Sequence, residues 1–251
     1  MAYRLRNTNL QLKFATNTTK ESQSLLYQRL KNIGFEIEKH EIFTSLTAAR
    51  DLIAPKKLKP YFLVDDAALS DFEGHVPIDT PTSNANAVVV GLAPTKFNHE
   101  QMNIAMNILL EGSPLYAIHK GRFYKTKDGL ALGPGPFIAA LEHATDKKAI
   151  VVGKPQPSFF KEAIRSFNCE PNEVAMIGDV IVILFCDSND ELNITQDVRD
   201  DIGGAQNIGM VGFLVKTGKY RPEDESKIDP LPKFVCPSVV EAVDIIISQM
   251  P

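Results

Sequence analysis

The side chains best suited to chemistry in this sequence stand directly after short apolar runs. They are the hydroxyl and amide groups of residues 16–19, the ammonium group of Lys154 and the carboxylate of Asp179, which is followed by further acids at 197–201. Hydroxyls and an amide at the start of a helix can bind a phosphate. An ammonium group attracts a dianion, and strand-end carboxylates suit Mg²⁺, which takes only one or two protein carboxylates.

Each of these features also has a purely structural explanation. Residues 16–19 could cap a helix, and Thr18 and Glu21 have the spacing of a capping box. A single lysine or a Gly-Asp pair at a strand end is commonly solvated surface. Taken one at a time, the three features therefore leave function open.

The elements that position these groups are predicted by the pattern of apolar residues. Short β-branched or aromatic runs alternate with helical patterns along the chain, and we expect strands at 10–15, 149–152 and 174–177, among others. This alternation is typical of an α/β fold with a parallel sheet. Ligands of open parallel sheets bind beyond the carboxyl ends of the strands, so the three polar strand ends are where we expect a site.

Composition excludes several classes of protein. The chain has 251 residues, of which 44% are hydrophobic and 23% charged, and a net charge of −4, so we expect no nucleic-acid partner. Its longest apolar run, 180–186, is too short to span a bilayer, and the first residues lack the apolar stretch of a signal peptide. We therefore expect a cytoplasmic protein without a membrane partner. Three widely spaced cysteines predict reduced thiols.

The order of the three strand ends carries more information than any one of them. Thr/Asn, then Lys, then Gly-Asp with trailing acids resembles motifs two, three and four of the haloacid-dehalogenase-like hydrolase superfamily. The stretches that carry the resemblance are FATNTTKES, EIFTSLTAAR, AIHKGRFYK, DGLALGPGPF, VVGKPQPSFF, DVRDDIGGAQ and LVKTGKYRPEDE. The resemblance covers nearly the whole chain apart from its first few residues and one internal segment. The resemblance implies a Rossmann-like parallel-sheet core at 1–43 and 149–251, with an inserted α/β cap domain at 44–148.

The resemblance also implies an activity, which is Mg²⁺-dependent hydrolysis of a small phosphate monoester through an aspartyl-phosphate. It assigns roles to residues of the matching motifs: phosphate binding to Thr16, Asn17 and Lys154, and Mg²⁺ binding to Asp179, supported by Asp200 and Asp201. Phosphoryl transfer depends on positioning and on neutralising negative charge, which Lys154 and Mg²⁺ would supply. A homodimer is a further expectation from the resemblance.

The sequence departs from the family pattern in two places. The family's first motif, Asp-x-Asp-Gly-Thr or Asp-x-Ser-Gly-Thr, supplies the nucleophile, but no aspartate occurs here before Asp51. Covalent catalysis by a carboxylate needs that carboxylate. In addition, residues 180–196 intervene between Asp179 and Asp197, where the family runs directly from one motif into the next.

These departures leave two hypotheses for the chain. The first is a phosphatase of this superfamily that is catalytically impaired. The second is a non-catalytic, truncated or mis-spliced isoform that acts at most as a phosphate-binding or partner-binding module.

Two other groups of polar residues follow predicted strands. His119, Lys120 and Arg122 could face the mouth of the active site, or they could form a solvated loop. Asp65 and Asp66 follow an apolar run, and we expect them to form a turn and the N-cap of the next segment.

Overall fold

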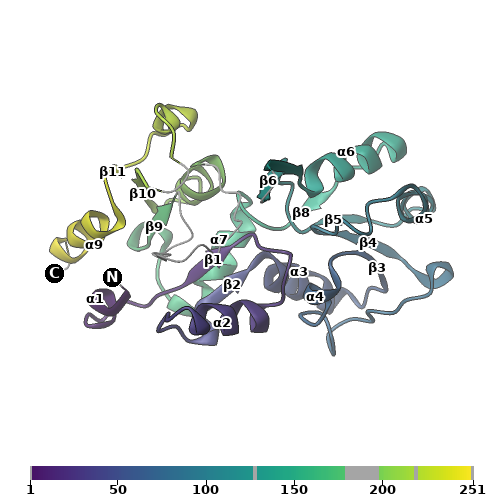
Figure 1. Ribbon diagram of the computed structural model, residues 1–251, viewed down its shortest axis with the longest axis horizontal. Coiled ribbons are helices and arrows are strands. Elements are labelled where there is room, and N and C mark those ends of the chain that lie inside the picture. The colour runs from purple at the N-terminus through teal and green to yellow at the C-terminus, as the bar shows by residue number, and fades with distance from the viewer. Residues whose placement is uncertain (1, 127–128, 179–197, 218–219, 250–251) are drawn as a thin grey trace.

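The structure is a computed structural model that describes residues 2–126, 129–178, 198–217 and 220–249 (Figure 1). It confirms the expected α/β fold, because its sheets are built from parallel strands with helices between them and only one hairpin is antiparallel among the described residues. Asp179, Asp197 and the intervening residues 180–196 lie outside the described residues.

The core half of the molecule combines segments from both ends of the described chain. Its strands form two parallel sheets, β1 (Phe14–Thr16) with β2 (Ile42–Thr44), and β9 (Ala175–Gly178), β10 (Val211–Val215) and β11 (Phe234–Cys236) in that spatial order. Its helices are α1 (Ala2–Arg6), α2 (Gln23–Asn32), α7 (Pro157–Ile164), α8 (Gly204–Gln206) and α9 (Val239–Ser248).

The two sheets of the core half share one apolar core. Ala15 of β1 and Met176 of β9 belong to the same buried cluster, together with Phe159 and Phe160 of α7. The ring of Phe159 lies against that of Phe43 in β2, with centroids 5.1 Å apart. Because helix α7 packs into this common core, the carboxyl ends of β1 and β9 are held on the same side of the molecule.

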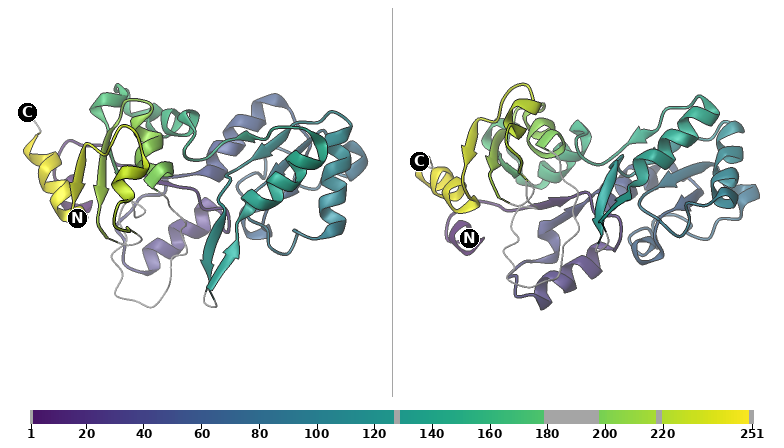
Figure 2. Two further views of the ribbon diagram at one scale, coloured as in Figure 1. Left: turned by 90° about the horizontal axis from the view of Figure 1, so that it is seen from above. Right: turned by 45° about the horizontal axis from the view of Figure 1, so that its top comes forward.

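The inserted half, residues 45–151, contains a four-stranded parallel sheet. Its order is β3 (Pro60–Leu63), β4 (Ala87–Val90), β5 (Leu115–Ala117) and β8 (Ile150–Val151). Its helices are α3 (Ser45–Ile53), α4 (Asp66–Leu69), α5 (His99–Leu110) and α6 (Pro134–Thr145), and an antiparallel hairpin joins β6 (Phe123–Thr126) to β7 (Gly129–Leu132). Figure 2 shows this hairpin projecting beside the core half.

The strand before Lys154 lies closer to the inserted half than the resemblance implies. We expected a strand at 149–152 to belong to the core, whereas β8 hydrogen-bonds with β5. The segment after β8 then crosses to the core half as α7. The division of the chain at residues 43 and 149 stays a prediction.

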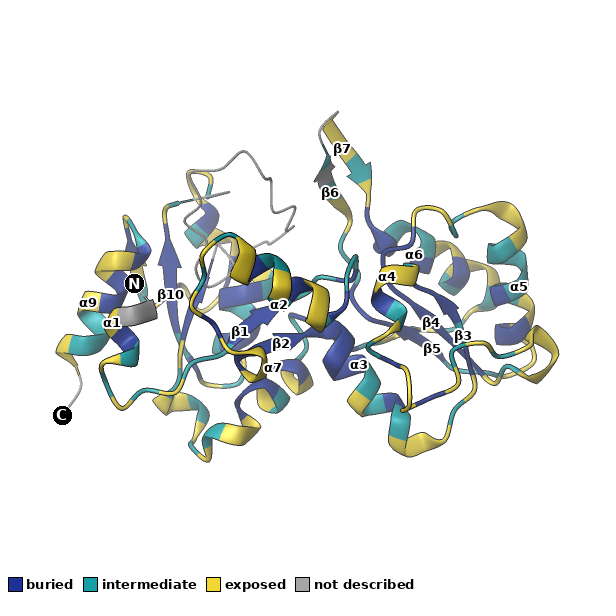
Figure 3. Cartoon of the chain, turned by 60° about the horizontal axis from the view of Figure 1, so that its bottom comes forward, coloured by how far each residue is buried: buried dark blue, intermediate teal, exposed yellow. Residues whose placement is uncertain are grey.

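The sheet of the inserted half is buried on both faces. Val88 and Val90 of β4 pack into one apolar cluster and Val89 into another, and all three side chains are fully buried. Continuous apolar strands of this kind are typical of parallel sheets covered by helices on both sides. Figure 3 shows these strands buried beneath partly exposed helices. No helix among the described residues is long and apolar enough to cross a membrane.

The helices α2 and α4, near the junction of the two halves, each begin at a residue whose side chain caps the helix. Asp65 caps α4 by accepting a hydrogen bond from the backbone of Ala67, which confirms the expected N-cap. The predicted capping box at Thr18 and Glu21 is wrong, because α2 begins later, where Ser22 accepts from the backbone of Leu25. The carboxylate of Asp71 also accepts from the backbone of Gln23, at 3.0 Å.

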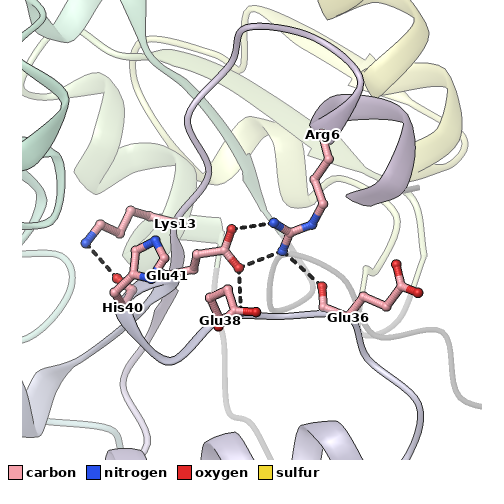
Figure 4. Close-up of polar contacts among 6 residues, drawn as sticks. All are labelled: Arg6, Lys13, Glu36, Glu38, His40 and Glu41. Carbon is pink, nitrogen blue, oxygen red and sulfur yellow. Dashed lines mark hydrogen bonds and ion pairs between the residues drawn. The ribbon is translucent and has the colours of Figure 1, made fainter.

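A buried carboxylate ties α1 to the start of β2 (Figure 4). The guanidinium group of Arg6 donates to both oxygens of Glu41, at 2.7 and 2.6 Å, and to the carbonyl of Glu36. Glu41 also accepts from the backbone of Glu38, and its side chain is only 8% exposed. Burial acts to raise the pKa of Glu41, but the hydrogen bonds from Arg6 and Glu38 outweigh it, so the pKa lies below its usual value.

Replacing Arg6 should therefore cost stability at neutral pH. We expect Arg6→Met to lower the free energy of unfolding by about 1.5–3 kcal/mol, because it removes charged hydrogen bonds from a buried carboxylate. The contribution of Glu41 is present above its unfolded pKa of 4.5 and is lost as the pH falls through the lower folded value. The difference in the free energy of unfolding between Arg6→Met and the unaltered protein, measured with urea, should become smaller below pH 4.5.

Arg4, on the same helix, is the matched control. It pairs with Asp244, but the two side chains are 47% and 50% exposed. Exposed pairs contribute about 0–1 kcal/mol, so Arg4→Met should change stability little. Equal losses in the Arg4 and Arg6 variants would contradict the role given to Glu41.

Candidate functional site

The site lies where β1 ends. Thr16 is the last residue of this strand and is buried, and its hydroxyl oxygen accepts a hydrogen bond from the backbone of Thr18. This bond shapes the turn at residues 16–19 that leads to the start of α2. The turn places the side chains of Asn17 and Thr19 toward the segment that follows β8 and toward the inserted half.

Asn17 joins motif two to motif three. Its amide nitrogen donates to the carbonyl of Lys154 at 3.1 Å, and its oxygen accepts from the backbone of Lys154 at 3.0 Å. One side chain therefore satisfies both main-chain groups of a residue 137 positions away. The resemblance assigns Asn17 to phosphate binding, and the structure shows that it also positions Lys154.

Glycine at position 153 makes this approach possible. A Cβ atom on Gly153 would lie 2.5 Å from Oδ1 of Asn17 and 2.7 Å from the carbonyl oxygen of Ile118. Real Cβ contacts of that length do not occur, so any other residue would push the turn away from Lys154. The Gly-Lys order of motif three thus has a packing reason.

The ammonium group of Lys154 is buried between the two sheets of the core half. The residue is 2% exposed, and Nζ donates to the carbonyl of Ala15 at 3.2 Å and to Oδ1 of Asp201 at 2.5 Å. Asp201 is itself 1% exposed and stands in a short π-helix, Arg199–Gly203, after β9. The cation is therefore held by β1 on one side and by the acidic segment on the other.

Lys154 and Asp201 are hydrogen-bonded to each other, while the magnesium site that the resemblance implies lies only partly within the described residues. Asp200 is half-buried beside Asp201, and Asp179 lies outside the described residues. No group of three or more metal-binding side chains occurs among the residues that the structure describes.

His119 connects the inserted half to the turn at 16–19. The residue is buried, its Nε2 lies 3.2 Å from the hydroxyl oxygen of Thr19, and its Nδ1 accepts from the backbone of Gly121 at 3.1 Å. Burial and the positive charge of Lys154 lower the pKa of His119 to about 4. The imidazole is therefore neutral at physiological pH.

The neighbours of His119 point to other partners. Lys120 donates to Glu142 at 2.7 Å, and the guanidinium group of Arg122 lies over the ring of Phe123. Of the three residues expected at the mouth of the site, His119 is thus the one in contact with motif two. Its contact with Thr19 spans 100 residues, and no spacing in the sequence could have indicated it.

Removing the ammonium group should destabilise the core half. We expect Lys154→Met to lower the free energy of unfolding by about 3–5 kcal/mol, because the buried Asp201 carboxylate loses its cation. The double variant with Asp201→Asn should lose less than the sum of the single variants. Chemical denaturation of the four proteins measures the coupling, and strict additivity would show that the two groups do not interact.

His119 should make stability depend on pH. An unfolded histidine titrates near 6.5, whereas the folded one titrates at about 4, so the unfolded state binds more protons between these values. Stability should fall as the pH drops through this window, by up to about 3 kcal/mol. We expect the free energy of unfolding, measured with urea, to fall less between pH 7 and pH 4.5 in His119→Asn than in the unaltered protein. An equal fall in both proteins would contradict the lowered pKa.

Two family models match this chain. A model of haloacid dehalogenase-like hydrolases matches residues 2–75, and a second model of HAD-like hydrolases matches residues 151–182 and 191–242. Haloacid dehalogenase-like hydrolase domain-containing protein 2 of Homo sapiens is 53% identical over 98% of this chain and 87% of its own length. Phospholysine phosphohistidine inorganic pyrophosphate phosphatase of Homo sapiens is 37% identical over 97% and 83%.

Solved structures share the fold. A p-nitrophenyl phosphatase from Archaeoglobus fulgidus superposes with a TM-score of 0.83, at 24% identity, over 97% of this chain and 89% of its own. NagD from E. coli K-12 superposes with a TM-score of 0.79, at 21% identity, over 96% and 88%. With the family models and the close relatives, these matches confirm the resemblance seen in the motifs, and the chain belongs to the haloacid dehalogenase-like hydrolase family.

Proposed function

We propose that the polypeptide of residues 1–251 binds a phosphoryl group at the end of β1 without hydrolysing it through an aspartyl-phosphate. The observation that carries the proposal is the placement of Lys154: Asn17 holds its backbone, and Ala15 and Asp201 hold its ammonium group at the end of the strand that Thr16 closes. A fixed cation next to a strand-end hydroxyl suits a small phosphorylated ligand, because recognition of phosphate depends on positioned charge.

The relatives support a phosphoryl ligand. Two of the similar proteins named above are phosphatases of p-nitrophenyl phosphate and of phospholysine, phosphohistidine and pyrophosphate. HAD-like hydrolases generally use Mg²⁺. We propose that Asp179, with Asp200 and Asp201 in support, would hold this ion here, and that the ion would neutralise phosphate charge.

Hydrolysis needs a nucleophile that these 251 residues do not supply at the family position. Within residues 1–251 the first aspartate is Asp51, which lies on the exposed side of α3. The described strands β1 and β9 also belong to separate sheets. We therefore favour binding over turnover for this polypeptide.

We also propose the ligand class, the location and the assembly of the protein. The moderate negative net charge supports a small phosphorylated ligand rather than nucleic acid. We propose the cytoplasm as its location and a homodimer as its assembly, the latter on the resemblance alone.

Calorimetric titration with inorganic phosphate in the presence of Mg²⁺ tests the binding. We expect the unaltered protein to bind, and Thr16→Val to bind at least about 10-fold more weakly, because the variant lacks one hydrogen bond to a charged group. Lys161→Met, an exposed lysine of α7, is the control and should bind normally. Absence of binding by the unaltered protein would refute the proposal.

An assay with p-nitrophenyl phosphate and Mg²⁺ tests the absence of turnover. We expect hydrolysis at the rate of the buffer alone. Hydrolysis above that rate that disappears in Lys154→Met would favour the other hypothesis, an active phosphatase. Hydrolysis that survives in Lys154→Met would come from a contaminant.

A further inference from the structure

A small cavity separates the turn at 16–19 from the inserted half. Its volume is about 30 Å³, and polar groups of Asn17, Thr19, Lys20 and His119 line it together with the ring of Tyr124. Such a volume has room for about two water-sized groups. The cavity therefore has room for one or two ligand atoms beside Thr19.

The hydrogen bonds of His119 fix which ring nitrogen carries the proton. Nδ1 accepts from the backbone of Gly121, so it has no hydrogen of its own. A neutral imidazole then carries its hydrogen on Nε2. Nε2 faces Thr19, so His119 donates to the hydroxyl oxygen of Thr19 at 3.2 Å and does not accept from it.

A second donor reaches the same oxygen. The backbone of Leu92 donates to the hydroxyl oxygen of Thr19 at 3.0 Å. A hydroxyl has two acceptor lone pairs and one hydrogen, and both lone pairs of Thr19 are used. Its hydrogen must point elsewhere, and none of the residues described in the structure accepts it. Thr19 is 2% exposed and lines the cavity, so a group that enters the cavity could accept this hydrogen.

The cavity also carries positive charge. The ammonium group of Lys20 lies 4.2 Å from the centre of the Tyr124 ring, on the hairpin strand β6. Tyr124 thereby holds a cation at the edge of the same space that Thr19 faces. A donor without an acceptor and a nearby cation favour an occupant that is anionic and can only accept hydrogen bonds.

We infer that this cavity takes an oxyanion oxygen of the phosphorylated ligand, that Thr19 donates to it, and that His119 is the positioning residue that keeps Thr19 a donor. The inference rests on the proposed function and adds a specific contact to it. The oxygen comes either from the phosphoryl group itself or from a second anionic group on the ligand. Both sources present the same chemistry to Thr19.

Calorimetric titrations with inorganic phosphate and with phosphonoacetate, both with Mg²⁺, separate the sources. We expect Thr19→Val to weaken binding at least about 10-fold and Thr19→Ser to restore it to within about 3-fold, because serine keeps the hydroxyl. Weakening with both ligands assigns the oxygen to the phosphoryl group. Weakening with phosphonoacetate alone assigns it to the second anionic group.

Nitrogen NMR of the His119 ring tests the positioning role without a ligand and without a variant. The ring should show a hydrogen on Nε2 at pH 7. A hydrogen on Nδ1 would overturn the inference.

The inference would also be overturned if Thr19→Val had the circular dichroism of the unaltered protein and bound both ligands normally. The proposed function would still stand in that case. Failure of the unaltered protein to bind either ligand would overturn both proposals.

Discussion

The burial of one ammonium group constrains the whole site. Moving a charged amine out of water is costly unless partners of opposite charge and correct geometry replace the solvent. Lys154 finds these partners in the carbonyl of Ala15 and the carboxylate of Asp201. The end of β1, the segment after β8 and the π-helix after β9 must therefore keep their mutual positions, or the charge loses its compensation.

The same charge acts beyond its direct partners. Lys154 helps to keep His119 neutral, and a neutral ring that accepts from Gly121 has only one way to place its hydrogen. That placement decides the hydrogen-bonding direction of Thr19. The charge of Lys154 in the core half thus helps to set the orientation of the Thr19 hydroxyl at the boundary with the inserted half.

Sequence patterns predicted the parts of this arrangement that follow from local chemistry. Apolar runs located the strands that end near Thr16 and Lys154, and motif order led us to expect one site at these strand ends. The start of α2 was predicted wrongly, because Ser22 and Asp71 together offer the helix a better cap than Thr18 does. The contact of His119 with Thr19 joins residues that no periodicity relates, so only the packing of the two halves reveals it.

The ion pair between Lys154 and Asp201 also has a consequence for chain length. It joins residues 47 positions apart and so closes a loop that contains residues 180–196. The entropy of closing a flexible loop grows only with the logarithm of its length, and omitting these residues would change the closure free energy by about 0.4 kcal/mol. The closure free energy of this ion pair therefore depends only weakly on the number of residues between its two partners.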